Sequence, residues 1–299
     1  GEDGFERTNP NKPVFVKIPE FYYKIEKSGN IFRYYIADGS LDGFSLHPGS
    51  GCYVARYEGV KGNSSGTSTM RSDSGLTPST SDTRDGFRVT SKATATGFQL
   101  YDFAAWCAVG LLYRVEYADW GSQEKIGPGI VNDTAAHKTG ETDAMVYHTG
   151  RANSGDNAAV QYRGVENPWG NVSEFIDGIN VEQRSTYISI DPENYSDDSL
   201  STNSYSSAGV SLPSNGYTKE LGLSSKYPWA FLPFSSGGGS SSSYVTDAVY
   251  GGDGLRVLNV GGHITSNREA GLFFFHAGVA SSGTSNKVGT RLQFREVKA

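Results

Sequence analysis

One stretch of the chain has the apolar spacing of an amphipathic helix. Across residues 98–117, apolar side chains recur in steps of three and four and so share one broad helical face. These side chains are Leu100, Phe103, Ala104, Cys107, Leu111, Leu112 and Val115. A weaker pattern of the same kind covers part of residues 83–95. The sequence therefore predicts one or two helices, and the rest of the fold must be built from other elements.

Glycine interrupts most of the remaining sequence. The chain of 299 residues contains 38 glycines and many Ser, Asn, Thr and Tyr residues, which favour turns between short strands. Tyr, Ser, Gly and Asn are also the residues that adaptable binding loops prefer. A hydrophobic fraction of 36% is enough for a sizeable core, in one large domain or in one domain with an appendage.

The strand candidates are β-rich runs bounded by turn residues. Residues 21–26 and 31–36 flank the polar turn 27–30, which predicts a hairpin. Further strands are expected at residues 14–19, 52–57 and 160–165. Segments rich in small polar residues are expected to be loops, the last of them resembling a linker: 61–83, 118–160, 191–220 and 235–243.

Residues 162–175 carry the most specific motif of the chain. Trp169 supplies an apolar anchor, Gly170-Asn171 a turn, and Glu174 a carboxylate that we expect to support this turn rather than to act as an acid. The motif resembles the Trp-Gly-Asn-x-x-Glu-Trp segment of the formylglycine-generating-enzyme (sulfatase-modifying factor) family, with Phe175 in place of the second Trp. Members of that family have a C-type-lectin-like fold.

The C-terminal segment extends this resemblance. Residues 254–262, residues 270–273 and the sequence Gly289-Thr-Arg-Leu292, which contains Arg291, look like the closing strands of the same family. The frame is similar to that of two non-catalytic groups: the variable proteins of diversity-generating retroelements, which include phage receptor-binding tail proteins, and gut-phage tail or structural proteins. Three upstream segments resemble the second group: 18–24, 43–48 and 112–118.

The resemblance implies an α+β fold. We expect a C-type-lectin-like domain of short twisted strands, one or two helices and long loops at residues 76–299, after a β-rich N-terminal lead-in at residues 1–75. Within this domain, residues 254–292 would be a candidate variable ligand-binding segment. A fold does not determine an activity, so the residues themselves must decide between binding and catalysis.

Several residue patterns argue against catalysis. Formylglycine-generating enzymes bind copper through two cysteines in their C-terminal half, whereas no cysteine follows Cys107 here. The related sulfoxide synthases need three clustered histidines, and no His-x-x-x-His pair occurs among the histidines of this chain: His47, His137, His148, His263 and His276. A phosphate-binding loop of the Gly-x-x-x-x-Gly-Lys-Ser/Thr type is also missing from the sequence. We therefore expect no enzyme, metal or cofactor; the alternatives are a metal-dependent oxidase of this superfamily and a purely structural virion protein.

Two further features leave alternatives open. Cys52 and Cys107 could form one disulfide, but the helical pattern around Cys107 favours a buried free thiol there. The acidic run at residues 191–198 could bind calcium through carboxylates, but it lacks the spacing of an EF-hand, so a solvated loop is favoured.

The resemblance also places the candidate ligand-binding residues. By position against the retroelement variable proteins, the exposed side chains would be Asn259, His263, Thr265, Asn267, Arg268, Phe275, His276, Ser281 and Thr284. The apolar frame between them would be Leu255, Val257, Leu258, Val260, Leu272, Phe274, Val288 and Leu292. Strand alternation would place Leu272 and Phe274 on one side and Phe273 and Phe275 on the other. The alternative is that residues 273–275 all belong to the core.

Together with these patterns, the resemblance implies a non-catalytic ligand- or receptor-binding protein, such as a phage tail or surface protein, with a protein or glycan receptor on a cell surface as its partner. The location would be extracellular, on a virion tail or a cell surface. The net charge of -6 comes from interspersed charges, so we expect no nucleic-acid partner, and no apolar run is long enough for membrane insertion. Because the chain begins with Gly1 rather than Met, we expect it to lack its native N-terminus. The ligand, its diversification and a homo-oligomeric state stay open.

Overall fold

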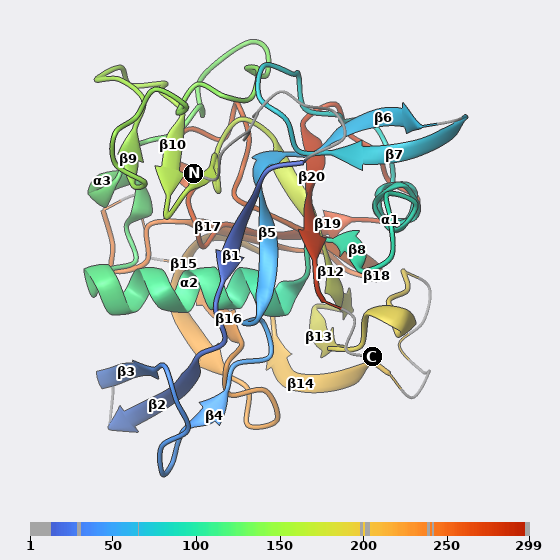
Figure 1. The fold of residues 1–299 in the computed structure, drawn as a ribbon. Coiled ribbons are helices and arrows are strands. Elements are labelled where there is room, and N and C mark those ends of the chain that lie inside the picture. The colour runs from blue at the N-terminus through green and yellow to red at the C-terminus, as the bar shows by residue number, and fades with distance from the viewer. Residues whose placement is uncertain are drawn as a thin grey trace.

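The computed structural model describes residues 13–28, 31–64, 66–197, 200, 204–237, 240 and 242–296. Strands account for 38% of the structure and helices for 12%, and a mixed sheet of 12 strands within the described residues organises the fold (Figure 1). The expected α+β class is therefore wrong, because the protein is mainly β. Segments that were expected to be loops supply several of the strands, and this is why the sequence underestimates the sheet.

The large sheet has one continuous path of hydrogen-bonded strands. In spatial order these are β1 (Phe15–Ile18), β5 (Cys52–Glu58), β20 (Val288–Phe294), β12 (Ser173–Glu182), β18 (Leu255–Val260), β19 (Phe275–Val279), β17 (Ala248–Gly251), β15 (Asn215–Leu223) and β16 (Phe231–Ser236). Three strands attach beside this path: β8 (Phe98–Leu100) on β20, β13 (Ser185–Ile188) on β12, and β14 (Ser206–Ser211) on β13.

Smaller sheets and short helices surround the large sheet. The smaller sheets are formed by β2 (Tyr22–Ser28), β3 (Ile31–Ala37) and β4 (Ser45–Leu46), by β6 (Val60–Ser64) and β7 (Thr67–Arg71), and by β9 (Gly150–Arg151), β10 (Val160–Tyr162) and β11 (Val165–Glu166). The helices are α1 (Arg84–Lys92), α2 (Phe103–Tyr117), α3 (Ser122–Lys125) and the 3-10 turns η1 (Pro192–Asn194) and η2 (Asn267–Glu269).

Strand β20 holds the two halves of the sheet together. It follows every other strand of the sheet in the sequence, yet it lies between β5, to which it is antiparallel, and β12, to which it is parallel. The register places Arg291 opposite Glu58 and Gly289 opposite Glu174. The lead-in strands β1 and β5 therefore share one sheet with β20, the last of the described strands.

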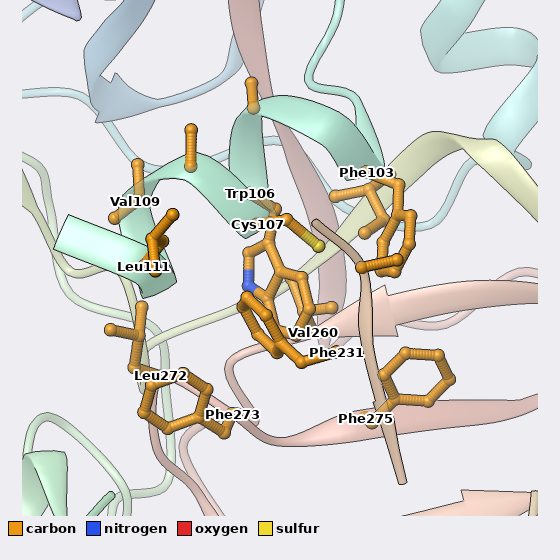
Figure 2. Packing of buried hydrophobic residues seen from close by; sticks show 14 of the residues in the cluster. Phe103, Trp106, Cys107, Val109, Leu111, Phe231, Val260, Leu272, Phe273 and Phe275 are labelled. Carbon is orange, nitrogen blue, oxygen red and sulfur yellow. The ribbon is translucent and has the colours of Figure 1, made fainter. Parts of the chain in front are cut away.

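Helix α2 covers the core of the large sheet. Its first turn is capped by the side chain of Asp102, which accepts a hydrogen bond from the backbone N–H of Ala105 at 2.8 Å. Figure 2 shows Trp106 and Cys107 among the aromatic side chains that the strands contribute, and the ring of Trp106 lies 5.2 Å from that of Phe231. Gly110 permits this close packing, because a Cβ there would lie 2.4 Å from the ring of Phe231.

Local periodicity predicted some elements correctly. The helix is confirmed at residues 103–117, the weaker helix at 84–92 and the N-terminal hairpin at β2 and β3. The start of the long helix is wrong, because Phe98–Leu100 is strand β8 and pairs with β20. The loops expected at 61–83 and 191–220 are also wrong in part, since they contain all of β7 and β14 and most of β6 and β15. Serine- and threonine-rich runs form these strands because neighbouring strands satisfy their backbone groups.

Some sequence predictions fall on residues outside the described ranges. These are residues 1–12 of the expected lead-in, residues 29–30 of the hairpin turn, Asp198 of the acidic run, and residues 238, 239 and 241 of the expected linker. Cys52 and Cys107 are both described, and both are buried free thiols, as the helical pattern indicated for Cys107. Among the described helices, none has the length and apolar character needed to cross a membrane.

Candidate recognition surface

The two sequence motifs meet in a buried ion pair. The guanidinium of Arg291 on β20 binds the carboxylate of Glu174 on β12, with a shortest distance of 2.6 Å between Nη2 and Oε1. The remaining N–H groups of Arg291 donate to backbone carbonyl groups at 2.7 to 3.1 Å: those of Ala55, Arg56, Glu166 and Asn167. Arg291 therefore links β5, β12 and the residues that precede the Gly170-Asn171 turn.

A different carboxylate supports the Gly170-Asn171 turn. Glu58 on β5 accepts a hydrogen bond from Nδ2 of Asn171 at 2.6 Å and from the backbone N–H of Val172 at 3.2 Å. The expectation that Glu174 supports this turn is wrong, since Glu174 is paired with Arg291. Burial raises the pKa of Glu58 to about 8. Sequence reasoning did not identify Glu58, because it lies 113 residues before Asn171.

The Gly170-Asn171 turn also supports the candidate ligand-binding segment, which the resemblance placed at the surface. Gly170 and Asn171 both have a positive φ, at 78° and 58°, which directs their peptide groups toward this segment. The backbone N–H of Gly170 donates to the carbonyl of Gly261 at 3.2 Å, and the carbonyl of Asn171 accepts from Ile264 at 3.0 Å. The indole of Trp169 is buried and donates to the carbonyl of Gly127 at 3.1 Å. The motif therefore anchors the start of residues 263–268, which we call the recognition segment.

The structure divides the predicted ligand-binding residues by exposure. Thr265, Asn267, Arg268 and Thr284 are exposed, and His263, His276 and Ser281 are partly buried. The expectation of exposure is wrong for Asn259 and Phe275, which are buried. Phe275 is the first residue of β19, and its ring packs near those of Phe103 and Trp106 at 6.4 and 6.2 Å.

The alternation expected across Leu272 to Phe275 does not occur. Residues 272–274 form a turn rather than a strand, and all four apolar side chains of residues 272–275 are buried. The alternative that Phe273 to Phe275 belong to the core is therefore confirmed. The rest of the predicted frame is buried except Leu255, which is partly exposed.

Thr265 lies between two nitrogen groups. Nδ1 of His263 is 3.2 Å from Oγ1 of Thr265, and the ammonium of Lys287 donates to the same oxygen at 2.8 Å. Burial lowers the pKa of His263 to about 4, and the charge of Lys287 contributes to this decrease. His263 is therefore neutral at pH 7, so it takes part in hydrogen bonding without adding a second positive charge beside Lys287.

Asn267 and Arg268 are exposed side chains on a backbone that is held in place. The backbone N–H of Asn267, which has a φ of 51°, donates to the carbonyl of Val131 at 2.8 Å. Its carbonyl accepts a hydrogen bond from Nε2 of Gln123 at 3.0 Å. Both side chains border a groove of about 980 Å³, whose other lining residues include Gln123, Asn132, Tyr244 and Thr246. We call it the 267–268 groove.

The remaining predicted residues lie in other places. His276 contacts Asn259, with 3.1 Å between Nδ1 and Nδ2, and its ring lies 5.2 Å from that of Tyr250. Burial lowers the pKa of His276. Ser281 borders a separate small cavity together with Arg88. The structure thus brings His263, Thr265, Asn267 and Arg268 together on one short segment but does not form one site from all nine residues.

Sequence reasoning missed two polar residues of this surface. Gln123 lies on α3, within a segment expected to be loop, and no sequence pattern connects it to Asn267. Lys287 lies inside the candidate segment 254–292, so sequence reasoning could have included its charge. In the structure its ammonium contacts Thr265. In the described parts of the chain, no group of three or more His, Cys, Asp or Glu residues is arranged to hold a metal ion. Asp197, which belongs to the acidic run at residues 191–198, is buried and forms ion pairs with Arg84 and Arg88, so this part of the run is not the solvated loop that was expected.

Comparison with models of known protein families finds no match for this chain. Comparison with curated proteins finds no match either.

Proposed function

We propose that this protein is a non-catalytic ligand- or receptor-binding protein whose recognition surface is formed by residues 263–268 and the 267–268 groove. The observation that carries this proposal is the combination of a fixed backbone with exposed, chemically different side chains. Thr265, Asn267 and Arg268 supply a hydroxyl, an amide and a guanidinium within four residues. A rigid surface of this kind loses little conformational entropy when it binds a partner.

The backbone of the recognition segment is held from several sides. Hydrogen bonds link it to the Gly170-Asn171 turn, to Val131, to Asp133 and to Gln123. Within the described residues, the side chain of Arg268 has neither a hydrogen bond nor an ion pair, so its donors are available to a partner. An exposed arginine can bind a carboxylate through two parallel hydrogen bonds, and arginine is frequent among the residues that dominate binding energies.

The sequence resemblance supports a more specific version of the proposal. The Trp169 to Glu174 motif and the Gly289-Thr-Arg-Leu292 strand resemble those of non-catalytic retroelement variable proteins and gut-phage tail proteins. On this basis the protein is an extracellular component of a virion tail or cell surface, and its partner is a protein or glycan receptor. Diversification of residues 254–292 forms part of this proposal, and a near-copy of the coding segment that differs at adenines would support it.

A binding comparison of two matched double variants tests the recognition surface. The full chain, the Thr265→Ala/Arg268→Ala variant and the Thr67→Ala/Arg151→Ala control would be applied to an array of glycans and bacterial surface proteins. All four positions are exposed, and the control changes the same residue types on a different part of the molecule. We expect at least a tenfold loss of affinity for the first variant and no loss for the control. Equal binding by both variants, or no binding by the unmodified chain, would contradict the proposal.

A further inference from the structure

A second cavity lies at the end of helix α2, between the N-terminal hairpin and the β15–β16 pair. It has a volume of about 530 Å³, and its walls are largely aromatic and aliphatic. The main ring-bearing residues of its wall are Phe32, Tyr34, Trp120, Phe231, Phe234 and Tyr244. Phe234 and Tyr244 are 55% and 73% exposed, so they form an unusually apolar rim. We call this cavity the Arg114 pocket, because Arg114 lines it.

Among the described residues, no counter-ion forms a hydrogen bond with the buried cation Arg114. Its side chain belongs to α2, and the residue is only 3% exposed. Nε donates to the carbonyl of Gly110 at 3.3 Å, whereas Nη1 and Nη2 have no hydrogen-bond partner. The guanidinium carbon lies 4.1 Å from the ring centre of Tyr34, 4.7 Å from that of Trp120 and 4.2 Å from that of Phe231.

The aromatic rings stabilise the charge of Arg114 only in part. Ring faces attract a cation, but they do not replace the oxygen acceptors that guanidinium N–H groups require when they are buried. Burial lowers the pKa of Arg114, and the nearby Tyr34 offsets this decrease only partly. The hydroxyl of Tyr34 is close enough to the guanidinium to raise the pKa of Arg114 against this decrease, but its geometry leaves Nη1 and Nη2 without a completed hydrogen bond. Within the described part of the chain, the site therefore has two strong donors at the floor of a cavity that form no hydrogen bond of good geometry.

The geometry points to the Arg114 pocket as a binding site for a small carboxylate attached to a ring, with the carboxylate at Nη1 and Nη2 and the ring against the aromatic walls. A guanidinium presents two parallel donors whose spacing matches the two oxygens of a carboxylate. The exposed amines of Lys27 and Lys219 at the cavity wall add positive charge, while the carboxylate of Glu220 at the same wall opposes an anion there. The volume suits a ligand of one or two rings.

Entry of the ligand requires one of the covering rings to move. Both Nη atoms are covered in the structure, and Trp120 and Phe231 are buried in the core. Tyr34 is only partly buried and belongs to β3, which is part of a separate small sheet, so its ring is the one that can move with least loss of packing. The carboxylate then takes the place of this ring beside the guanidinium. The inference does not depend on the recognition segment, although Tyr244 borders both cavities.

Calorimetric titration of the full chain with benzoate and glucuronate tests this site. These acids carry the same carboxylate on an aromatic ring and on a sugar ring, so their relative affinities identify the ring type. Benzamide and glucose serve as neutral controls. We expect saturable binding of at least one acid and at least tenfold weaker binding of its neutral analogue. Absence of saturable binding of both acids, or equal affinity for acid and neutral analogue, would overturn the inference.

Variants locate the binding site. Arg114→Met should weaken binding of the acid at least tenfold, and Arg114→Lys should give an intermediate loss because it keeps the charge but not the two parallel donors. Arg151→Met, at an exposed arginine outside the pocket, should bind as the unmodified chain does. Saturation should also change the tryptophan fluorescence, and Trp120→Phe should remove that change. Unchanged affinity in Arg114→Met, or a fluorescence change that persists in Trp120→Phe, would contradict this location; the fluorescence test stands even where Arg114→Met does not fold.

Discussion

Arg291 and Arg114 are both buried, but their surroundings differ in kind. Arg291 is fully enclosed and binds the carboxylate of Glu174 and four backbone carbonyl groups. Arg114 contacts three aromatic rings and donates one hydrogen bond, to Gly110. Burial of a charge is costly unless partners compensate for it. The first arginine is therefore a completed structural element, whereas the second is incomplete until an anion binds.

The comparison shows how to distinguish a structural from a functional buried charge. Arg291 lies at the centre of the sheet, where every acceptor belongs to a strand or to a turn that the sheet holds. Arg114 lies at the end of a helix, beside a cavity that opens to solvent. In each case, the position of the arginine in the fold is consistent with the number of its N–H groups that have a hydrogen-bond acceptor. Variants of Arg291, Glu58 and Arg114 test this contrast.

The largest effect should come from Arg291→Met. This change leaves Glu174 buried without its partner, so we expect a loss of about 3–5 kcal/mol in the free energy of unfolding, measured with urea. The double variant Arg291→Met/Glu174→Leu should recover part of this loss, because it removes both charges. If the single variant were as stable as the unmodified chain, the ion pair would not contribute to the stability of the sheet.

An intermediate effect should appear in the pH dependence of stability through Glu58. The pKa of this carboxyl rises from 4.5 to about 8 on folding, so the folded state keeps a proton that the unfolded state releases. The resulting stabilisation is complete below pH 4.5 and is lost as the pH rises through 8, with a slope of at most about 1.4 kcal/mol per pH unit. Glu58→Gln should flatten this slope in urea titrations between these pH values. Identical slopes in both proteins would contradict the assignment.

Asp247 provides the background against which the Glu58 slope must be measured. Burial raises the pKa of this carboxyl to about 7, and its Oδ2 accepts a hydrogen bond from the backbone N–H of Phe273 at 2.8 Å. Asp247 therefore contributes a slope of the same sign, which remains in Glu58→Gln. Only the difference between the two proteins reports on Glu58.

The smallest effect should come from Arg114→Met. Loss of the ring contacts destabilises the fold, but removal of an uncompensated buried charge stabilises it. We expect the free energy of unfolding in urea to change by less than about 1 kcal/mol. A loss as large as that of Arg291→Met would mean that the aromatic rings alone satisfy this arginine, and the contrast between the two sites would disappear.

The sequence revealed those parts of the fold that have a local period. Helix α2 and the β2–β3 hairpin repeat their apolar residues at the spacing of a helix or a strand, and both are present. Strands β6 and β7 have no such period, because they are rich in small polar residues and gain their order from pairing with each other. The expected α+β class is wrong for this reason: strands without a local signal make the protein mainly β.

Residues of the candidate site could be predicted only where the motifs of the chain matched those of the similar family by position. Arg291 and Glu174 were placed in the frame, and they do form one ion pair. The role of Glu58 was missed, because contacts between distant strands leave no pattern in a single sequence. Phe275 was misplaced because the preceding residues turn instead of extending. Arg114 was not singled out at all, since its significance depends on the acceptors that are missing around it.

The central position of β20 has a consequence for the way the protein folds. Until residues 288–294 leave the ribosome, β5 and β12 lack the strand that joins them, and Glu174 has no counter-charge. Pairing of such distant segments makes folding slow, and unpaired strand edges invite association with other chains in the meantime. The nascent chain is therefore exposed to such association until β20 inserts between two strands that were synthesised much earlier.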